Sequence, residues 1–228
     1  METVRNFVIL EGGDGSGTTT QLELLRRRFA PGGGPRAGEP PAAFPALFTT
    51  AEPTAGPVGG LVRSALKGEI NLRGETLARL FAADRGEHLH GPGGILERAG
   101  RGELVVSDRY VPSSLVYQGL VCGEDLPRAL NADFPAPELI LFFDLDPAVA
   151  SERIKNRPGR DIYEYLDFQI RVRERYRALL PEFAGRGSRV EIVDAARSPE
   201  EVARAVWKAI LKMPIMGGSL QNLQNGEA

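Results

Sequence analysis

The sequence predicts an α/β fold in which about five parallel strands carry helices on both faces. The first observation is that short apolar segments alternate with helix-length segments along almost the whole chain. The second is that the apolar segments are rich in β-branched and aromatic residues, as buried parallel strands are. The third is a glycine-rich turn directly after the first of these segments. Together these features favour one α/β domain over residues 1–213.

Five short apolar segments are the expected strands, and they lie at residues 6–10, 47–50, 104–107, 138–145 and 190–193. The expected helices cover residues 19–29, 58–66, 75–90, 95–99, 167–180 and 199–212. One more helix begins at Asp146 as N-cap and Pro147 at the first helical position. Residues 30–45 are rich in Pro and Gly and predict a surface loop, and residues 214–228 predict a disordered tail.

Composition and charge argue against several kinds of partner. The 228 residues carry a net charge of −2, which gives no reason to expect nucleic acid or an anionic membrane as partner. No apolar run approaches the roughly 20 residues that a membrane helix needs. The single cysteine, Cys122, excludes an intrachain disulfide. We therefore expect a cytoplasmic protein.

The glycine-rich loop follows the phosphate-binding pattern G-x-x-x-x-G-K-[ST]. Gly12, Gly17 and Thr19 fall at the required spacing, whereas Thr18 stands where the pattern has lysine. Backbone N–H groups of such a loop converge on a phosphate, and the hydroxyl of Thr19 is placed to bind Mg²⁺. A tight turn without a ligand is the alternative, but the strand context and the spacing favour phosphate binding. The expected phosphate-binding residues are Gly12, Gly13, Asp14, Gly15, Ser16, Gly17, Thr18, Thr19 and Thr20.

Charged side chains follow three of the expected strands. Asp14, Glu52 and Asp108 come at strand ends, which meet in one crevice when the strands are parallel. Asp108 can organise Mg²⁺ or a substrate hydroxyl, and Arg109 beside it can form a fork with a phosphate.

Phe81 and Arg85 lie four residues apart on the expected helix 75–90 and so project from one face. The phenylalanine can stack on a base while the arginine hydrogen-bonds the edge of that base. A core phenylalanine beside a surface arginine is the alternative.

A basic cluster surrounds Pro158 and Gly159 between two expected helices. Such arginines suit a lid, at about residues 153–164, that closes over a triphosphate. A solvated helix end is the alternative. The cluster consists of Arg153, Lys155, Arg157 and Arg160.

Four of these segments together resemble bacterial thymidylate kinases, and the resemblance covers residues 6–211. The family's F-E-G-x-D-G-[AS]-G-K-T-T-Q corresponds to residues 10–21, LEGGDGSGTTTQ. Its T-R-E-P-G-G-T corresponds to residues 50–56, TAEPTAG, and its F-A-A-D-R-x-x-H to residues 81–88, FAADRGEH. Its D-R-Y-x-x-S-x-x-A-Y-Q-G corresponds to residues 108–119, DRYVPSSLVYQG.

The resemblance implies the three-layer fold of P-loop nucleoside monophosphate kinases, with a short lid, and a homodimer. It also implies ATP- and Mg²⁺-dependent phosphorylation of dTMP to dTDP. By position, Phe81 would stack on thymine, Arg85 would hydrogen-bond the edge of that base, and Ser114 would lie near the base. Arg109 would hold the acceptor phosphate. Asp14 would lie near the deoxyribose hydroxyl, and Tyr117 near C2′ of the sugar. The remaining expected substrate-binding residues are Glu52, Pro53, Asp108, Ser113 and Gln118. The expected metal ligands are Thr19 and Asp108. The expected catalytic residues are Asp14, Arg109, Arg157 and Arg160.

The chain departs from the family pattern at three cationic positions. Thr18 replaces the P-loop lysine, Ala51 the arginine before Glu-Pro, and Ile162 the arginine of the lid motif D-R-x-E. Arg157 and Arg160 lie nearby in the sequence and could substitute. Two other functions therefore stay open: a nucleotide-binding or regulatory protein with little catalysis, and a kinase of another nucleoside monophosphate.

Overall fold

The computed structural model describes residues 3–30, 44–155 and 162–217. In this part of the chain, parallel strands form one sheet in the order β2-β3-β1-β4-β5. The strands are β1 (Thr3–Gly12), β2 (Leu47–Ala51), β3 (Leu104–Asp108), β4 (Ala136–Asp144) and β5 (Arg189–Asp194). The expected five-stranded parallel sheet is confirmed. Because the strand order reverses around β1, a crevice is expected at the carboxyl ends of β1 and its neighbours.

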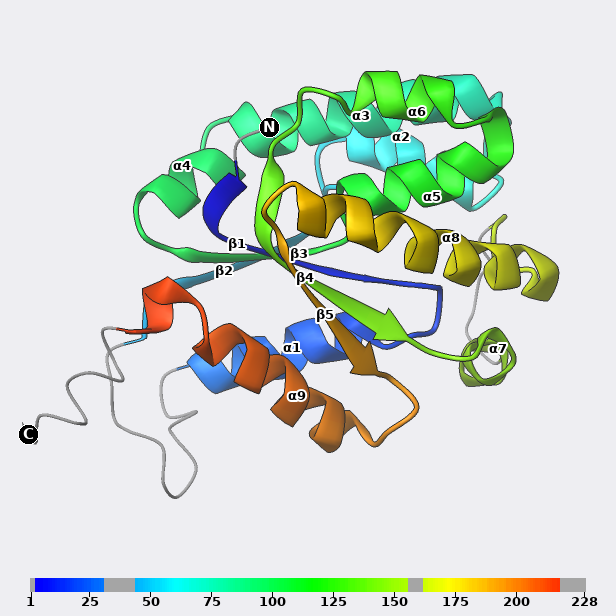
Figure 1. Cartoon of the computed structure of the whole chain (residues 1–228). Helices are drawn as coiled ribbons and strands as arrows, with labels where there is room; N and C mark the ends of the chain where they lie inside the picture. The colour runs from blue at the N-terminus through cyan, green and yellow to red at the C-terminus, as the bar shows by residue number, and fades with distance from the viewer. Residues whose placement is uncertain (1–2, 31–43, 156–161, 218–228) are drawn as a thin grey trace, which may run out of the picture.

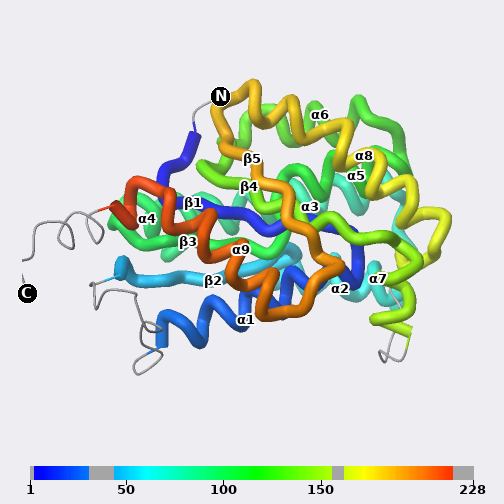
Figure 2. The backbone as a smooth tube through the Cα atoms, turned by 60° about the horizontal axis from the view of Figure 1, so that its bottom comes forward, coloured from blue at the N-terminus to red at the C-terminus, as the bar shows by residue number. Residues whose placement is uncertain are grey.

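Helices cover both faces of the sheet, as Figures 1 and 2 show. Helices α1 and α9 lie on one face, and α2, α3, α5, α6 and α8 lie on the other (Figure 1). None of the described helices is long and apolar enough to cross a membrane. The helices are α1 (Thr18–Phe29), α2 (Pro57–Leu66), α3 (Gly74–His90), α4 (Ile95–Gly100), α5 (Val111–Cys122), α6 (Asp125–Leu130), α7 (Pro147–Ile154), α8 (Leu166–Gly185) and α9 (Pro199–Leu211).

The central strand shows why its sequence is a continuous apolar run. Successive side chains of a strand point to opposite faces. Phe7 and Ile9 therefore pack into the core under α3, α5 and α8, whereas Val8 and Leu10 pack into the core under α1 and α9. All four side chains are fully buried, so β1 carries no polar alternation.

Two helices, α5 and α6, were not expected from the sequence. Helix α5 reads VPSSLVYQGLVC and buries residues on almost every side, because it packs between α3, α6 and α8. A helix that is buried on nearly all sides lacks the one-sided stripe by which a surface helix is recognised. Helix α8 also extends to Gly185, past Pro181, where the sequence predicted an end at Leu180.

The prediction of a disordered tail from residue 214 is wrong for residues 214–217. These residues form a helical turn, and Met213 and Met216 are buried in the core beneath α1 and α9. The physical reason is that two methionines spaced three apart fill one side of a turn with flexible apolar side chains. The rest of the expected tail lies outside the described residues, as does most of the loop expected at 30–45.

Candidate active site

The glycine-rich loop between β1 and α1 has the backbone shape of a phosphate cradle. Gly15 and Gly17 have φ values of +82° and +96°, in the left-handed region that favours glycine. A Cβ atom at Gly15 would lie 2.7 Å from the carbonyl oxygen of Ala150, so a side chain is excluded there. The loop lines a cavity of about 520 Å³ at the N-terminus of α1. Successive backbone N–H groups in such a turn attract anions, which fits the phosphates of a nucleotide.

The two expected metal ligands lie in contact. The hydroxyl of Thr19 donates a 2.9 Å hydrogen bond to Oδ2 of Asp108, at the end of β3. The other carboxylate oxygen, Oδ1 of Asp108, is buried and has no hydrogen-bond partner among the described residues. Mg²⁺ is bound by such hard oxygen atoms together with substrate phosphates. Thr19 and Asp108 therefore fit a Mg²⁺ ion at the edge of the phosphate cavity.

Within the described ranges, the basic side chains that line the phosphate cavity are all arginines. Arg153 donates to the carbonyl oxygen of Ala195 (3.1 Å), and Arg197 is held by Asp194 (3.0 Å). Arg109 lines the cavity from the turn after β3. The expected lid arginines, Arg157 and Arg160, lie outside the described residues. Arg197 was not predicted, and its only signal is that it follows the carboxyl end of a strand.

A second cavity, of about 130 Å³, opens beside the first. Asp14 and Arg109 line both cavities, so the two cavities are adjacent at these side chains. Leu66, Tyr110 and Tyr163 also contribute to its wall and were not predicted. The expected substrate-binding residues around this cavity are Glu52, Pro53, Phe81, Arg85, Arg109, Ser113, Ser114, Tyr117 and Gln118.

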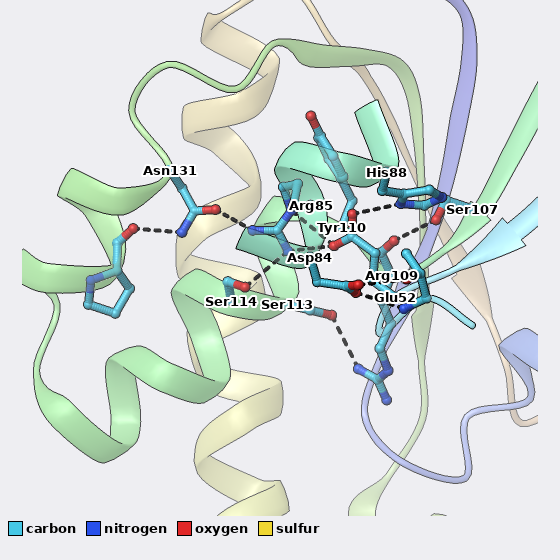
Figure 3. Close-up of polar contacts among 12 residues, drawn as sticks. Glu52, Asp84, Arg85, His88, Ser107, Arg109, Tyr110, Ser113, Ser114 and Asn131 are labelled. Atoms are coloured by element: carbon cyan, nitrogen blue, oxygen red, sulfur yellow. Dashed lines mark hydrogen bonds and ion pairs between the residues drawn. The ribbon is translucent and has the colours of Figure 1, made fainter. Parts of the chain in front are cut away.

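Arg85 is buried and held by three partners, so the alternative of a surface arginine is wrong. Its side chain is 1% exposed and lies at the centre of the network in Figure 3. Nε and Nη2 donate to one oxygen of Glu52 (2.9 and 2.6 Å), Nη2 also donates to Ser114 (3.0 Å), and Nη1 donates to Asn131. Asn131, from the end of α6, was not predicted. This network fixes the guanidinium plane at the wall of the second cavity.

The second oxygen of Glu52 is held by His88, through Nδ1 at 3.0 Å. Nε2 of His88 lies 2.6 Å from the hydroxyl of Thr50. His88 follows Arg85 by three residues on α3 and therefore shares its face, a signal that could have placed it in the site. Glu52 thus acts on the cavity mainly by orienting Arg85.

Arg109 is held at the junction of the two cavities. Its Nη2 pairs with Oδ1 of Asp14 at 2.6 Å, and its Nη1 donates to Gly12 O (3.1 Å) and to Ser113 (3.2 Å). Gln169, from α8, donates to the other oxygen of Asp14 (2.7 Å) and accepts the N–H of Asp14 (3.0 Å). This pairing was not predicted, because a single glutamine in a helix carries no local signal. The arrangement presents a cation at the point where two anionic groups would meet.

Aromatic rings form part of the wall of the second cavity. Tyr163 stacks on Phe168 at 5.1 Å between ring centroids, and its ring lies 5.7 Å from that of Tyr117. Burial raises the pKa of Tyr163 to about 12, so its hydroxyl stays neutral at physiological pH. Phe81 comes from α3 to line the same cavity. The walls therefore suit a flat ring such as a base.

Replacing Glu52 by alanine is expected to destabilise the fold by about 3–5 kcal/mol, because the guanidinium of Arg85 would stay buried without its carboxylate. The matched control is Glu182→Ala, which breaks an exposed pair with Arg128 and is expected to cost at most about 1 kcal/mol. Urea unfolding of both variants measures the two losses. Equal losses would contradict this account of the network.

The parallel sheet with its glycine-rich loop defines a P-loop fold of the nucleoside monophosphate kinase type, with a second cavity beside the loop. A model of the family described as thymidylate kinase matches residues 10–206. The chain belongs to the thymidylate kinase family.

Individual relatives agree with the family match. The chain is 41% identical to a Treponema pallidum protein named "Putative thymidylate kinase", over 78% of this chain and 81% of that protein. It is 37% identical to the "Probable thymidylate kinase" of Pyrobaculum aerophilum, over 91% and 97%. It is 35% identical to the "Thymidylate kinase" of Oleidesulfovibrio alaskensis, over 92% and 100%. Bacterial and archaeal proteins both stand among these relatives, so the match shows membership in the family as a whole.

Proposed function

We propose that this protein transfers the γ-phosphoryl group of ATP to dTMP and so forms dTDP, with Mg²⁺ as cofactor. The observation that carries the proposal is that Asp14 and Arg109 line both cavities. A nucleoside triphosphate on the P-loop and a nucleoside monophosphate in the second cavity would meet at this junction. Positioning of two bound reactants supplies a large part of the rate in phosphoryl transfer.

In the proposed reaction an oxygen of the acceptor phosphate attacks the γ-phosphorus of ATP. The new P–O bond forms as the bond between the γ-phosphorus and the β,γ-bridging oxygen breaks, and ADP leaves with that electron pair. Arg109 offsets the repulsion between the two anions by donating to the acceptor phosphate. Thr19 and Asp108 would hold Mg²⁺, which supplies positive charge to the β- and γ-phosphates.

The acceptor is assigned to the second cavity by its walls. Phe81 would stack on the thymine ring, and the oriented guanidinium of Arg85 would donate to the edge of the base, together with Ser114. Tyr117 would pack near C2′ and disfavour a ribose hydroxyl. Gln118, Ser113 and Pro53 would complete the enclosure.

A second candidate is a nucleotide-binding protein with little turnover. Thr18, Ala51 and Ile162 favour it, because the family pattern has a cation at each of these positions. A third candidate is a kinase of another nucleoside monophosphate. Phosphorus NMR of the protein with ATP, Mg²⁺ and each of dTMP, dUMP, dCMP and dGMP separates the three. We expect dTDP as the main product; binding of dTMP without turnover would favour the second candidate, and faster turnover of another acceptor the third.

We also propose that lid arginines do part of the work of the missing lysine. Arg160→Ala is then expected to lower kcat by at least about tenfold. In a Thr18→Lys background the same change is expected to cost less, because the restored lysine would supply the charge. Initial rates of dTDP formation for the four proteins of this cycle measure the coupling. Equal losses in both backgrounds would show that Arg160 and residue 18 act independently.

We further propose a cytoplasmic homodimer without nucleic acid or membrane partners. The single cysteine and the near-zero net charge support the location and the absence of anionic partners. Family membership supports the dimer. Analytical ultracentrifugation tests it, and a purely monomeric protein would contradict it.

A further inference from the structure

The carboxyl group of Glu11 lies behind both cavities, and no step of the proposed reaction uses it. Glu11 is the second-last residue of β1 and is fully buried. Its Oε1 accepts the backbone N–H of Tyr110 (2.9 Å), and its Oε2 accepts the hydroxyls of Ser113 (2.6 Å) and Tyr176 (2.8 Å). The turn after β3, helix α5 and helix α8 therefore converge on one carboxyl group.

Two of these contacts lead directly to Arg109. Arg109 has a φ of +73°, a left-handed conformation that is unfavourable for a residue with a side chain. Glu11 fixes the next N–H along the chain, that of Tyr110, and so holds this turn. Ser113, which donates to Glu11, accepts a hydrogen bond from Nη1 of Arg109 (3.2 Å). The backbone and the guanidinium of Arg109 are thus both tied to the same carboxyl group.

We propose that Glu11 is a positioning residue whose ionised carboxyl group aims Arg109 at the junction of the two cavities. The inference rests on the proposed function of Arg109 and extends it to a residue outside the cavities.

The available protons explain why ionisation matters. When Glu11 is ionised, Ser113 and Tyr176 each give their single hydroxyl proton to Oε2, and the serine oxygen is free to accept from Arg109. A proton on Oε2 would instead point at one of these two hydroxyl oxygens. The bond that this hydroxyl donates to Oε2 would then be lost or turned along the 2.8 Å contact between Ser113 and Tyr176, and the negative charge that attracts Arg109 would be gone. Protonation therefore loosens the guanidinium.

The charged and titratable groups around Glu11 come from few directions. Arg109 faces it from the turn after β3, where Tyr110 contributes its backbone N–H, and Tyr176 faces it from α8. Helix α5 presents the uncharged Ser113, and β4 presents the uncharged Phe142. Asp14, Asp108 and Tyr117 act on Arg109. Burial raises the pKa of Glu11 to about 7, and the bond from Ser113, the charge of Arg109 and the bond from Tyr176 limit the rise. Burial also raises the pKa of Tyr176 well above its ordinary range, so its hydroxyl stays a donor.

Stability and activity are expected to respond to this proton in opposite directions. The pKa of Glu11 rises from 4.5 to about 7 on folding, so the native state binds the proton more tightly than the unfolded chain. Its contribution to stability is complete below pH 4.5 and is lost as the pH rises through about 7. The ionised carboxyl group that positions Arg109, by contrast, forms over the same rise in pH, so activity is expected to increase there. A merely structural role would not produce this opposition.

The test is Glu11→Gln, which keeps the shape of the side chain and removes its charge. The quantity measured is the ratio of wild-type to variant kcat/KM for dTMP, since the titration of the substrate phosphates cancels in this ratio. We expect a ratio near one at about pH 5.5 that rises to at least about tenfold at about pH 8, mainly through KM. A ratio that does not change with pH would overturn the proposal.

Two further variants serve as controls for this test. Glu138→Gln makes the same change at the opposite end of the sheet, where Glu138 accepts the N–H of Asn6 (2.6 Å), and its ratio is expected to stay near one at every pH. Tyr176→Phe removes one hydrogen-bond donor to Glu11, so the acid limb of its pH–activity profile is expected to lie at higher pH than that of the wild-type protein. An acid limb at the wild-type pH would contradict the proposal, even if Glu11→Gln does not fold. If the wild-type protein forms no dTDP, the proposed function fails. The pH-dependent ratio of dTMP affinities, measured by calorimetry without ATP, then still decides the role of Glu11.

Discussion

Replacing Arg109 by alanine is expected to lower kcat/KM for dTMP by about 10²–10³, the usual effect of removing one preorganised donor from a developing charge. Arg109 lines both cavities, and its guanidinium is already fixed by Asp14, Gly12 and Ser113. Its loss would remove the cation between two phosphates and leave the carboxylate of Asp14 beside them. Steady-state rates at saturating ATP, with dTMP varied, measure the effect.

Two comparisons make this result specific. Arg109→Lys is expected to recover little activity, because an ammonium group cannot contact Asp14 and a phosphate with a planar fork. Arg128→Ala removes an arginine from the exposed pair with Glu182 and is expected to leave the rate within about twofold. A loss of less than tenfold in Arg109→Ala would show that another group holds the acceptor phosphate.

Replacing Asp108 by asparagine is expected to lower kcat by about 10²-fold and to raise the Mg²⁺ concentration required for half-maximal rate. The carboxylate of Asp108 contacts Thr19 through one oxygen, and its other oxygen is buried without a hydrogen-bond partner among the described residues. The amide of asparagine cannot replace the two carboxylate oxygens, because it carries no charge and has an N–H donor in place of one of them. Rates over a Mg²⁺ titration measure both effects.

The control for this variant is Asp144→Asn, at the end of β4, on the other side of β1 from β3. Asp144 pairs with Arg173 (2.6 Å) and Arg177 (2.5 Å), and these arginines hold the pKa of its carboxyl below the ordinary value against the effect of burial. It lies outside the lining of the phosphate cavity. Its Mg²⁺ dependence is expected to match that of the wild-type protein. An identical response of the two variants would place the metal elsewhere.

Local patterns in the sequence predicted the sheet and part of the wall of the second cavity, and the family resemblance predicted much of the rest of that wall. The strands are continuous apolar runs, and Phe81 and Arg85 share a helix face by spacing alone. The partners that orient the site could not be predicted in this way. Gln169 reaches Asp14 across 155 residues, and Tyr176 reaches Glu11 across 165. Such contacts depend on where α8 lies over the sheet, and the spacing of apolar residues along the chain does not encode that position.

The same limit applies to helix α5. Its sequence carries Ser113, Ser114 and Tyr117, whose roles were expected from their motif, yet the helix itself was missed. Burial on nearly all sides removed the one-sided pattern that identifies a surface helix. The motif therefore located the residues, whereas the helix that presents them to the cavity came only from the structure.

The central claim is that the chain phosphorylates dTMP although Thr18 replaces the P-loop lysine. The most direct measurement is dTDP formation from ATP, Mg²⁺ and dTMP in a coupled assay, with calorimetric titration of dTMP on the same sample. The account predicts saturable binding of dTMP together with turnover well above background. Binding of dTMP without turnover would contradict it, and would make Thr18, Ala51 and Ile162 the marks of a protein that binds nucleotide without transferring phosphate.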